Sequence, residues 1–342
     1  MNDILRLEIT DLCNLKCKMC WSKNWNHLEM EWRQLKKLVY NFKESGGRCI
    51  VLTSREPLLS KNFNNILRLC SVLAIELKLL TNGTLISDDV AKNIVQCDCL
   101  NYIAISLHGN EKHHDEIVGV DGAYSKVISS LNYLNYYKKL YKRNDLEIRL
   151  TAVVSNGLVR DIEEIIYVAE KYSVDLRIQH FMWQPNYIKN LYSEDKIMEG
   201  FPSICDIGYD EVCELITKAK ELCNKKNIDL QIYPQLDNEE ILRWYSDDYN
   251  QYVEFCKNND LFCEHAMNSI RIRANGEVSF CQYVNLCFGN VVNDSFFSII
   301  NDNDLLSYRK RVKKGMLFPI CYHCCHIKKI KENVSPLEKN EI

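Results

Sequence analysis

Strand-like apolar runs that alternate with helix-like segments are the feature that most constrains the fold of this chain of 342 residues. Between the runs, apolar residues recur at helical spacing, as at Val127, Leu131 and Leu134. This alternation is typical of parallel α/β sheets, and right-handed crossovers would curl the sheet into an open barrel with function at the carboxyl ends of its strands. We expect strands at residues 4–9, 49–53, 75–80, 102–107, 146–154 and 176–181.

The pattern divides the chain into four segments. Residues 1–203 are predicted to form a partial (β/α)6 TIM-like open barrel, ending in a loop at 183–203 that crosses the barrel mouth. Residues 204–255 are predicted as bridging helices at 209–225 and 238–252, with a short strand at 230–233 between them. Residues 256–327 are predicted to form a small hairpin-plus-helix domain with one helix around 296–314, followed by a polar tail at 328–342. The predicted fold class is therefore α/β.

Charge and cysteine content exclude some classes of function. The formal net charge of -3 gives no footprint for nucleic acid, and the basic residues Lys126, Lys138, Lys139 and Arg143 are expected to be solvated surface. No stretch reaches the length of a membrane span and no leader precedes the first strand, so we expect a cytoplasmic protein. Cysteines in the cytoplasm are kept reduced and rarely form structural disulfides, so metal ligation is the simplest reason for 17 cysteines. Six of them fall in regular patterns and are expected to be small core residues: Cys49, Cys70, Cys97, Cys99, Cys213 and Cys223.

Three cysteines form a tight loop directly after the first strand-like run. Cys13, Cys17 and Cys20 can bind three irons of a cubane cluster and leave the fourth iron open to a ligand. Half a zinc site and a disulfide pair are the alternatives, but the next donors, His27 and Cys49, lie outside the loop. The spacing favours a [4Fe-4S] site.

A second cysteine set lies near the C-terminal end. Cys263 precedes an alternating strand, an Asn-Gly turn and a second strand that ends at Cys281. Cys321 and Cys324 then supply the paired thiols that close a four-ligand site. Taken alone, this set suits a zinc ribbon as well as an iron–sulfur cluster.

The first cysteine loop resembles the signature of the radical S-adenosylmethionine (SAM) superfamily, and later segments agree with this resemblance. Ser54-Arg55-Glu56-Pro57 stands where the family typically carries Gly-Gly-Glu-Pro. Thr81-Asn82-Gly83 and Ser106-Leu107-His108-Gly109 follow the next two strands, as in the family. The resemblance implies that SAM contacts Met19, Ser54, Glu56, Asn82 and Ser106.

The second cysteine set resembles the SPASM and twitch extensions of the same superfamily, including the Gly289-Asn290-Val291 that follows Cys281. The resemblance implies one auxiliary [4Fe-4S] cluster held by Cys263, Cys281, Cys321 and Cys324. The alternative ligands are Cys256, Cys287 and Cys325.

The resemblance implies that a reduced cluster cleaves SAM to a 5'-deoxyadenosyl radical, which abstracts hydrogen from an unactivated C–H bond. The leading hypothesis is an oxidoreductase that oxidises or crosslinks a peptide in ribosomal peptide maturation, reduced by a donor such as flavodoxin or ferredoxin. Cys13 lies so near the N-terminus that no leader-recognition domain is expected before it. The alternatives are a dehydrogenase or rearrangement enzyme for a carbohydrate, cyclitol or nucleotide-linked small molecule, and a zinc-binding interaction protein.

The sequence identifies no proton donor or acceptor. His108, His113 and His114 are expected to face solvent or to start a helix, since no fourth ligand accompanies them at metal spacing. Trp183, Tyr187, Cys205 and Tyr322 are expected to line the cavity or to pack near it.

Overall fold

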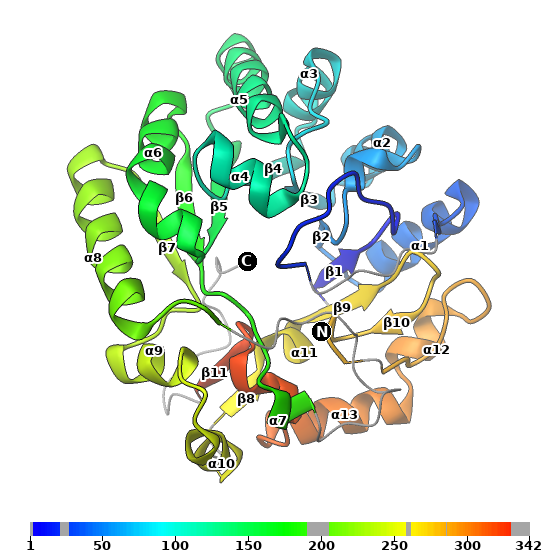
Figure 1. Cartoon of the computed structure of the whole chain (residues 1–342). Coiled ribbons are helices and arrows are strands. Elements are labelled where there is room, and N and C mark those ends of the chain that lie inside the picture. The colour runs from blue at the N-terminus through cyan, green and yellow to red at the C-terminus, as the bar shows by residue number, and fades with distance from the viewer. Residues whose placement is uncertain (1–2, 21–26, 190–204, 258–260, 285, 330–342) are drawn as a thin grey trace.

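A computed structural model of the chain describes residues 3–20, 27–189, 205–257, 261–284 and 286–329 (Figure 1). Within these residues nine strands form one sheet in the order β10-β9-β1-β2-β3-β4-β5-β6-β7. Strands β1 to β7 run parallel and confirm the expected α/β open barrel. The six predicted strands are all present, with ends that shift by at most two residues. They are β1 (Ile4–Leu7), β2 (Cys49–Leu52), β3 (Glu76–Thr81), β4 (Leu100–Ser106), β5 (Glu147–Val153) and β6 (Asp175–Gln179), and β7 is Leu230–Tyr233.

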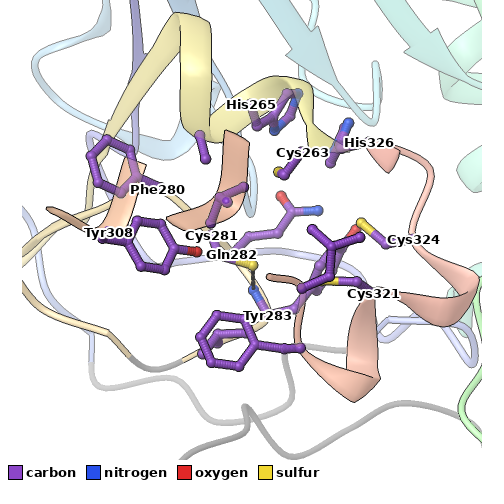
Figure 2. Close-up of a pocket in the computed structure, with 15 residues that line it drawn as sticks. Cys263, His265, Phe280, Cys281, Gln282, Tyr283, Tyr308, Cys321, Cys324 and His326 are labelled. Carbon is purple, nitrogen blue, oxygen red and sulfur yellow. Dashed lines mark hydrogen bonds between the residues drawn. The ribbon is translucent and has the colours of Figure 1, made fainter. Parts of the chain in front are cut away.

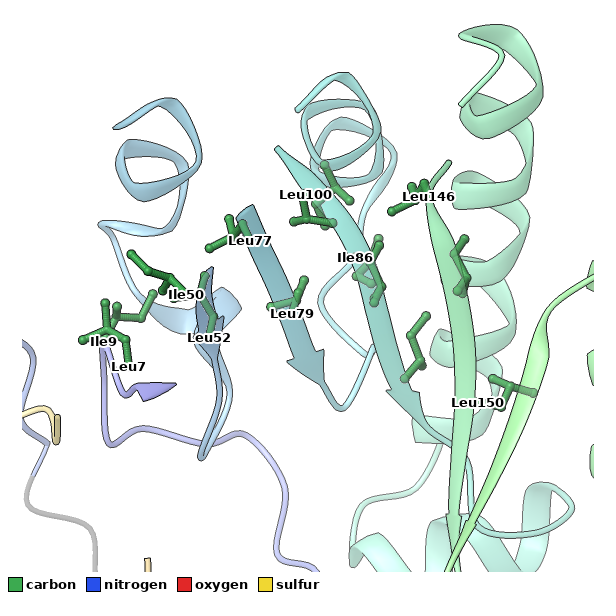
Figure 3. Packing of buried hydrophobic residues seen from close by; sticks show 14 of the residues in the cluster. Leu7, Ile9, Ile50, Leu52, Leu77, Leu79, Ile86, Leu100, Leu146 and Leu150 are labelled. Atoms are coloured by element: carbon green, nitrogen blue, oxygen red, sulfur yellow. The ribbon is translucent and has the colours of Figure 1, made fainter. Parts of the chain in front are cut away.

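Helices surround the strands on the outside of the barrel (Figure 1). They are α1 (Trp32–Glu44), α2 (Phe63–Leu73), α3 (Asp88–Gln96), α5 (Ala123–Leu140), α6 (Asn156–Tyr172) and α8 (Tyr209–Lys226), whereas α4 (Glu111–Val118) follows β4 and packs inward of α5. The outward-facing side chains of the strands, such as Leu7, Leu52 and Leu79, pack under these helices into one fully buried core (Figure 3). Because side chains alternate across a strand, the residues between them face the inside of the barrel.

The inside of the barrel carries charge. Arg6 alternates with Leu5 and Leu7 on β1, and Arg149 and Arg177 hold the corresponding alternating positions on β5 and β6. All three arginines are buried. Arg149 pairs with Glu147 and Asp229, with N···O distances of 2.7 Å.

The C-terminal segment completes the sheet on the other side of β1. Strand β9 (Ser269–Ile272) lies parallel to β1, with Ile4 beside Ser269 and Leu7 beside Ile272. Strand β10 (Val278–Ser279) returns antiparallel to β9, as the Asn-Gly turn predicts. The predicted hairpin is therefore an extension of the barrel sheet, and the segment boundaries given above stay predictions.

The rest of this segment surrounds the hairpin. Strands β8 (Leu261–Cys263) and β11 (Ile327–Lys329) form a two-stranded antiparallel sheet, and α11 (Glu264–Asn268) leads from β8 into β9. The helix expected around 296–314 is two helices, α12 (Phe296–Ile300) and α13 (Asn303–Lys313), because the Asp302 side chain caps a new start. A short 3-10 helix, η2 (Pro319–His323), carries Cys321.

Other sequence-based expectations differ from the structure or fall partly outside the described residues. The helix expected at 238–252 is α9 (Asn238–Trp244) followed by α10 (Tyr249–Lys257). Within the loop predicted at 183–203, residues Asn186–Lys189 form a short helix, α7, and residues 190–203 lie outside the described residues, as does the boundary at 203–204. Within the tail predicted at 328–342, Lys328 and Lys329 belong to β11, and the tail from 330 lies outside the described residues. Arg143 is not solvated surface: it is buried and donates hydrogen bonds to the carbonyl oxygens of Val95, Cys97 and Leu100.

Along the described ranges, no helix is both long and apolar enough to cross a membrane.

Candidate functional site

The first cysteine loop, Cys13 to Cys20, leaves the carboxyl end of β1 and rests on the end of α4. The backbone N–H groups of Lys16 and Lys18 donate to the carbonyl oxygens of Val118 and Ile117, each at 2.9 Å. Gly119 follows with φ +68°, and a Cβ atom there would lie 3.0 Å from the Lys16 carbonyl oxygen. Close contact between loop and helix therefore depends on this glycine.

The three thiols of the loop lie within electrostatic reach of one another and are half-buried. Burial, and then the neighbouring Cys20 and Cys13, raises the pKa of Cys17 to about 12. Burial also raises the pKa of Cys13, to which Glu56 and Cys20 contribute. Three thiolates crowded in this way need nearby positive charge to form, which ligated iron would supply. The donor set therefore fits the cluster expected from the sequence.

Glu56 joins the loops that follow β1, β2 and β3. Its carboxylate is fully buried and accepts hydrogen bonds from Thr81 Oγ1 at 2.7 Å, from the Asn82 N–H at 2.8 Å and from the Leu58 N–H at 3.1 Å. Its own N–H donates to the Leu12 carbonyl oxygen at 3.0 Å. Burial raises the pKa of this carboxyl from 4.5 to about 7. Glu56 thus ties the cysteine loop to the ends of two further strands.

Asn82 extends the same junction. Its side-chain amide donates to Asn14 Oδ1 at 2.9 Å, and its Oδ1 accepts from the Thr84 N–H at 2.9 Å. Asn14 in turn donates to Thr84 Oγ1 at 2.8 Å. These contacts fix Asn14 of the cysteine loop against the loop that follows β3.

Ser54 and Arg55 keep a backbone conformation that usually requires glycine. Their φ angles are +66° and +50°, so two successive residues with side chains lie in the left-handed region. These positions are the ones at which the family that the sequence resembles typically carries two glycines. A residue with a side chain in the left-handed region costs about 1–2 kcal/mol.

The other two predicted SAM contacts also lie at the carboxyl edge of the sheet. Met19 is half-buried between Cys17 and Cys20, and Ser106 is the half-buried last residue of β4, in register with Thr151 of β5. All five predicted SAM contacts therefore follow β1 to β4 at one edge. Their contacts with SAM stay a prediction.

The histidines near this edge differ from the sequence expectation. His113 and His114 lie in the first turn of α4, but His108 and His114 are buried and stacked, with ring centroids 5.7 Å apart. Their Nδ1 atoms accept from backbone N–H groups, and burial lowers the pKa of His108 to about 3 and of His114 to about 4. These lowered pKa values favour neutral rings near pH 7.

The second cysteine set converges on one cavity (Figure 2). Cys263 at the end of β8, Cys281 after β10, and Cys321 and Cys324 around η2 all line it. Burial and the neighbouring Cys324 raise the pKa of Cys281 to about 11. Four thiols from three segments thus face one another, and this donor set fits a second cluster.

The three alternative ligands differ in their settings. Cys325 is buried next to Cys324, and its Sγ lies 3.5 Å from His326 Nε2. Cys287 is exposed and its Sγ donates to the Gly289 carbonyl oxygen at 3.2 Å. The side chain of Cys256 is outside the described part of the structure.

Several residues near this cavity were missed by the sequence analysis. His265 and His326 line it and stack with centroids 3.2 Å apart, and Tyr308 stacks on Phe280 (Figure 2). Arg6 and Arg271 lie side by side on β1 and β9. The sequence pattern could have identified these two arginines, because each alternates with buried aliphatic residues along its strand and so must face the inside of the barrel.

The aromatic residues proposed near the cavity are mostly packing residues. Trp183 is buried and stacks on His323 with ring centroids 4.8 Å apart. Tyr322 is buried and packs edge-on against Tyr252. Tyr187 packs beside Tyr252, whereas the half-buried thiol of Cys205 interacts with the Ile207 carbonyl oxygen at 3.8 Å.

Two family models match the chain. The radical SAM superfamily model matches residues 7–139, and SPASM, an iron–sulfur cluster-binding domain, matches residues 263–325. The first match contains the first cysteine loop and all five predicted SAM contacts. The second begins at Cys263 and ends at Cys325. The two domains imply a SAM-binding [4Fe-4S] cluster and auxiliary iron–sulfur binding.

Individual relatives span different chemistries. The sporulation killing factor maturation protein SkfB of Bacillus subtilis is 21% identical over 90% of this chain and 67% of its own length. A GTP 3',8-cyclase of Clostridium perfringens is 26% identical over 92% of this chain and 89% of its own length. The matches span 42% to 67% of the lengths of the first three curated relatives.

Among solved structures, Streptococcus suis SuiB bound to its precursor peptide SuiA has a TM-score of 0.66 to this chain at 14% identity. The match covers 90% of this chain and 66% of SuiB. At this level of identity the likeness concerns the fold.

Proposed function

Because the chain belongs to the radical SAM superfamily and carries a C-terminal SPASM domain, we propose that it is an oxidoreductase that oxidises or crosslinks a peptide. When bound, the first cluster and SAM supply the one-electron chemistry that removes hydrogen from an unactivated C–H bond. The chain itself holds the cofactors, orients them and shields them from water.

The observation that carries this proposal is the convergence of Cys263, Cys281, Cys321 and Cys324 on one cavity beside the barrel. A second electron carrier suits an oxidation, because the substrate must lose an electron after it loses a hydrogen atom. By their names, the relative SkfB is a maturation protein and SuiB binds a precursor peptide. Both support a peptide as the substrate.

The described residues divide the work at the first cluster. Cys13, Cys17 and Cys20 would ligate iron, and Glu56 with Asn82 would hold the loop against the strand ends. The SAM contacts that we propose are the five predicted from the sequence: Met19, Ser54, Glu56, Asn82 and Ser106. We further propose that a flavodoxin or ferredoxin supplies the reducing electron.

The test is anaerobic turnover of the reconstituted enzyme with dithionite, SAM and candidate precursor peptides. We expect 5'-deoxyadenosine together with a peptide that is two hydrogens lighter. A Cys281→Ser variant is expected to form 5'-deoxyadenosine without the oxidised peptide, since only the second cysteine set is altered. If no peptide changes mass while a sugar or nucleotide does, the substrate assignment is wrong.

One observation favours a second candidate, an enzyme for a nucleotide-linked small molecule. Arg6 is buried inside the barrel, and among the described residues it has no ion pair and its Nε has no hydrogen-bond partner. Burial, and then Arg271, lowers the pKa of Arg6 to about 10. A buried cation of this kind calls for an anionic ligand, such as a phosphate. The GTP 3',8-cyclase relative acts, by its name, on a nucleotide.

Thermal shifts with GTP and with inorganic pyrophosphate test this second candidate. The wild-type melting temperature should rise and that of Arg6→Met should not, while the exposed control Arg33→Met should respond like the wild type. Equal shifts in wild type and Arg6→Met would exclude an anion site at Arg6.

The zinc-binding alternative makes a different prediction about donor geometry. Tetrahedral zinc with Zn–S bonds of about 2.3 Å draws its sulfurs to within about 4 Å of one another. Across the described ranges, no three His, Cys, Asp or Glu side chains are arranged to hold a single metal ion. The ligands of a cluster bind separate irons, so their sulfurs can lie farther apart than those of a zinc site. Iron and sulfide analysis of reconstituted protein tests this, and zinc without iron would refute our proposal.

A further inference from the structure

A pair of cysteines lies at the opposite edge of the barrel from the first cysteine loop. Cys97 ends α3, and Cys99 immediately precedes β4, so both lie at the amino ends of the strands. Their Sγ atoms are 3.3 Å apart. Ser71 Oγ, from the end of α2, lies 3.5 Å from each of them. The pair belongs to neither cysteine set of the candidate site.

The turn that carries the pair is held rigidly. The Leu77 N–H donates to the Cys99 carbonyl oxygen at 2.8 Å, and the Leu100 N–H donates to that of Cys97 at 3.0 Å. Arg143 adds hydrogen bonds to the Cys97 carbonyl oxygen at 3.0 Å and to that of Leu100 at 2.8 Å. Both cysteine backbones are thereby fixed, which keeps the two sulfurs together.

The surroundings favour a thiolate in the pair. The hydrogen bond from Cys99 lowers the pKa of Cys97, and Ser71 adds to this effect. Arg143 supplies positive charge within electrostatic reach of Cys97. A thiolate next to a thiol is the arrangement that attacks disulfides and then resolves the mixed product. Access is from the α2 side, where Ser71 is exposed and Cys99 is half-buried, whereas Cys97 is buried beside them.

We propose that Cys97 and Cys99 form a redox-active dithiol that closes to a disulfide by exchange with a small disulfide such as oxidised glutathione. The thiolate attacks one sulfur of glutathione disulfide and releases one glutathione thiolate. The second cysteine loses its proton and attacks the protein sulfur of the mixed disulfide, releasing the second glutathione. The two cysteine sulfurs lose two electrons in total, and the two glutathione sulfurs gain them.

The sequence makes this pair easy to assay. Trypsin cleaves after Lys92 and after Lys112 and therefore releases residues 93–112 as one peptide. The only cysteines in this peptide are Cys97 and Cys99. The reconstituted enzyme is equilibrated without oxygen in glutathione buffers of stepped oxidation, alkylated and digested. The cluster absorbance is followed to show that the iron sites stay intact. The expected product is an unalkylated peptide that is two hydrogens lighter than the dithiol.

A synthetic peptide of residues 93–112 provides the reference. Because the fold holds the sulfurs 3.3 Å apart, the protein should form the disulfide with an equilibrium constant at least tenfold larger than the free peptide. An equal or smaller constant in the protein overturns the proposal.

Two variants separate this pair from other thiols. Cys99→Ser should stop at a mixed disulfide, seen as one glutathione on the 93–112 peptide. Cys213→Ser, a half-buried cysteine on α8, should behave like the wild type. A wild-type protein that also stops at the mixed disulfide would refute an intramolecular dithiol, as would loss of the disulfide in Cys213→Ser.

Discussion

Replacing Ser54 by glycine should stabilise the protein. Ser54 has a positive φ angle of +66° in the turn after β2, where Arg55 follows with +50°. Glycine reaches this region without a clash between Cβ and the backbone, so the substitution removes strain from the folded state. The same substitution loosens the unfolded chain, and this opposes the gain.

The net effect can be bounded. Left-handed conformations cost about 1–2 kcal/mol per residue, whereas the added freedom of glycine in the unfolded chain costs about 0.4–1 kcal/mol. We therefore expect about 0.5–1 kcal/mol of stabilisation for Ser54→Gly. For 342 residues, an unfolding entropy near 2 cal/mol/K per residue converts this to a rise of about 0.7–1.5 °C in Tm.

The assay is anaerobic thermal unfolding of the reconstituted protein without SAM. Ser54→Ala is one control, because it keeps the strain and should leave Tm nearly unchanged. Ser129→Gly is the other, because it makes a serine-to-glycine change at an exposed helical site on α5 and should lower Tm. If Ser54→Gly melts below the wild type, or if Ser54→Ala stabilises as much as Ser54→Gly, the strain argument is wrong.

Three further predictions concern the iron sites and their support. Reconstituted wild type should hold about eight irons and each of Cys17→Ala and Cys281→Ala about four, by iron and sulfide analysis; unchanged iron in either variant would remove that cysteine from the ligand set. Gly119→Ala should lose iron from the first loop, since its Cβ would lie 3.0 Å from the Lys16 carbonyl oxygen, whereas Gly122→Ala, with similar φ but its nearest neighbour 3.8 Å away, should keep it. Glu56→Gln should lower stability by about 1–3 kcal/mol through a lost backbone hydrogen bond. Because the folded pKa of Glu56 is raised from 4.5 to about 7, its protonation stabilises the fold at low pH, and this contribution is lost as the pH rises through 7. The Tm difference between wild type and Glu56→Gln should therefore be larger at pH 5.5 than at pH 8, and a difference that grows with pH would contradict the assigned pKa.

Local patterns were sufficient for the barrel. The strands β1 to β6 have apolar runs bounded by polar turns, so their positions follow from the sequence. The first cysteine loop was recognisable because its spacing is local. The sequence also indicated the hairpin through Asn275 and Gly276, which form the turn between β9 and β10.

Local sequence patterns did not predict the contacts between segments that are far apart in the chain. No signal in residues 269–272 identifies β1 as their partner, since pairing across such a distance depends on the packed barrel. Arg143 reads as a surface cation, yet it satisfies carbonyl oxygens at the ends of α3 and β4. His108 and His114 have the sequence context of polar loop residues, and their burial and mutual stacking depend on tertiary packing that a local pattern does not show.

The pairing of β9 with β1 has a consequence for biosynthesis. β1 carries the first cysteine loop, and one of its two neighbours is the tract 269–272, which the ribosome makes more than 250 residues later. During translation β1 therefore keeps one open hydrogen-bonding edge until residues 269–272 have been made, although the contacts that hold the first cysteine loop all come from earlier residues.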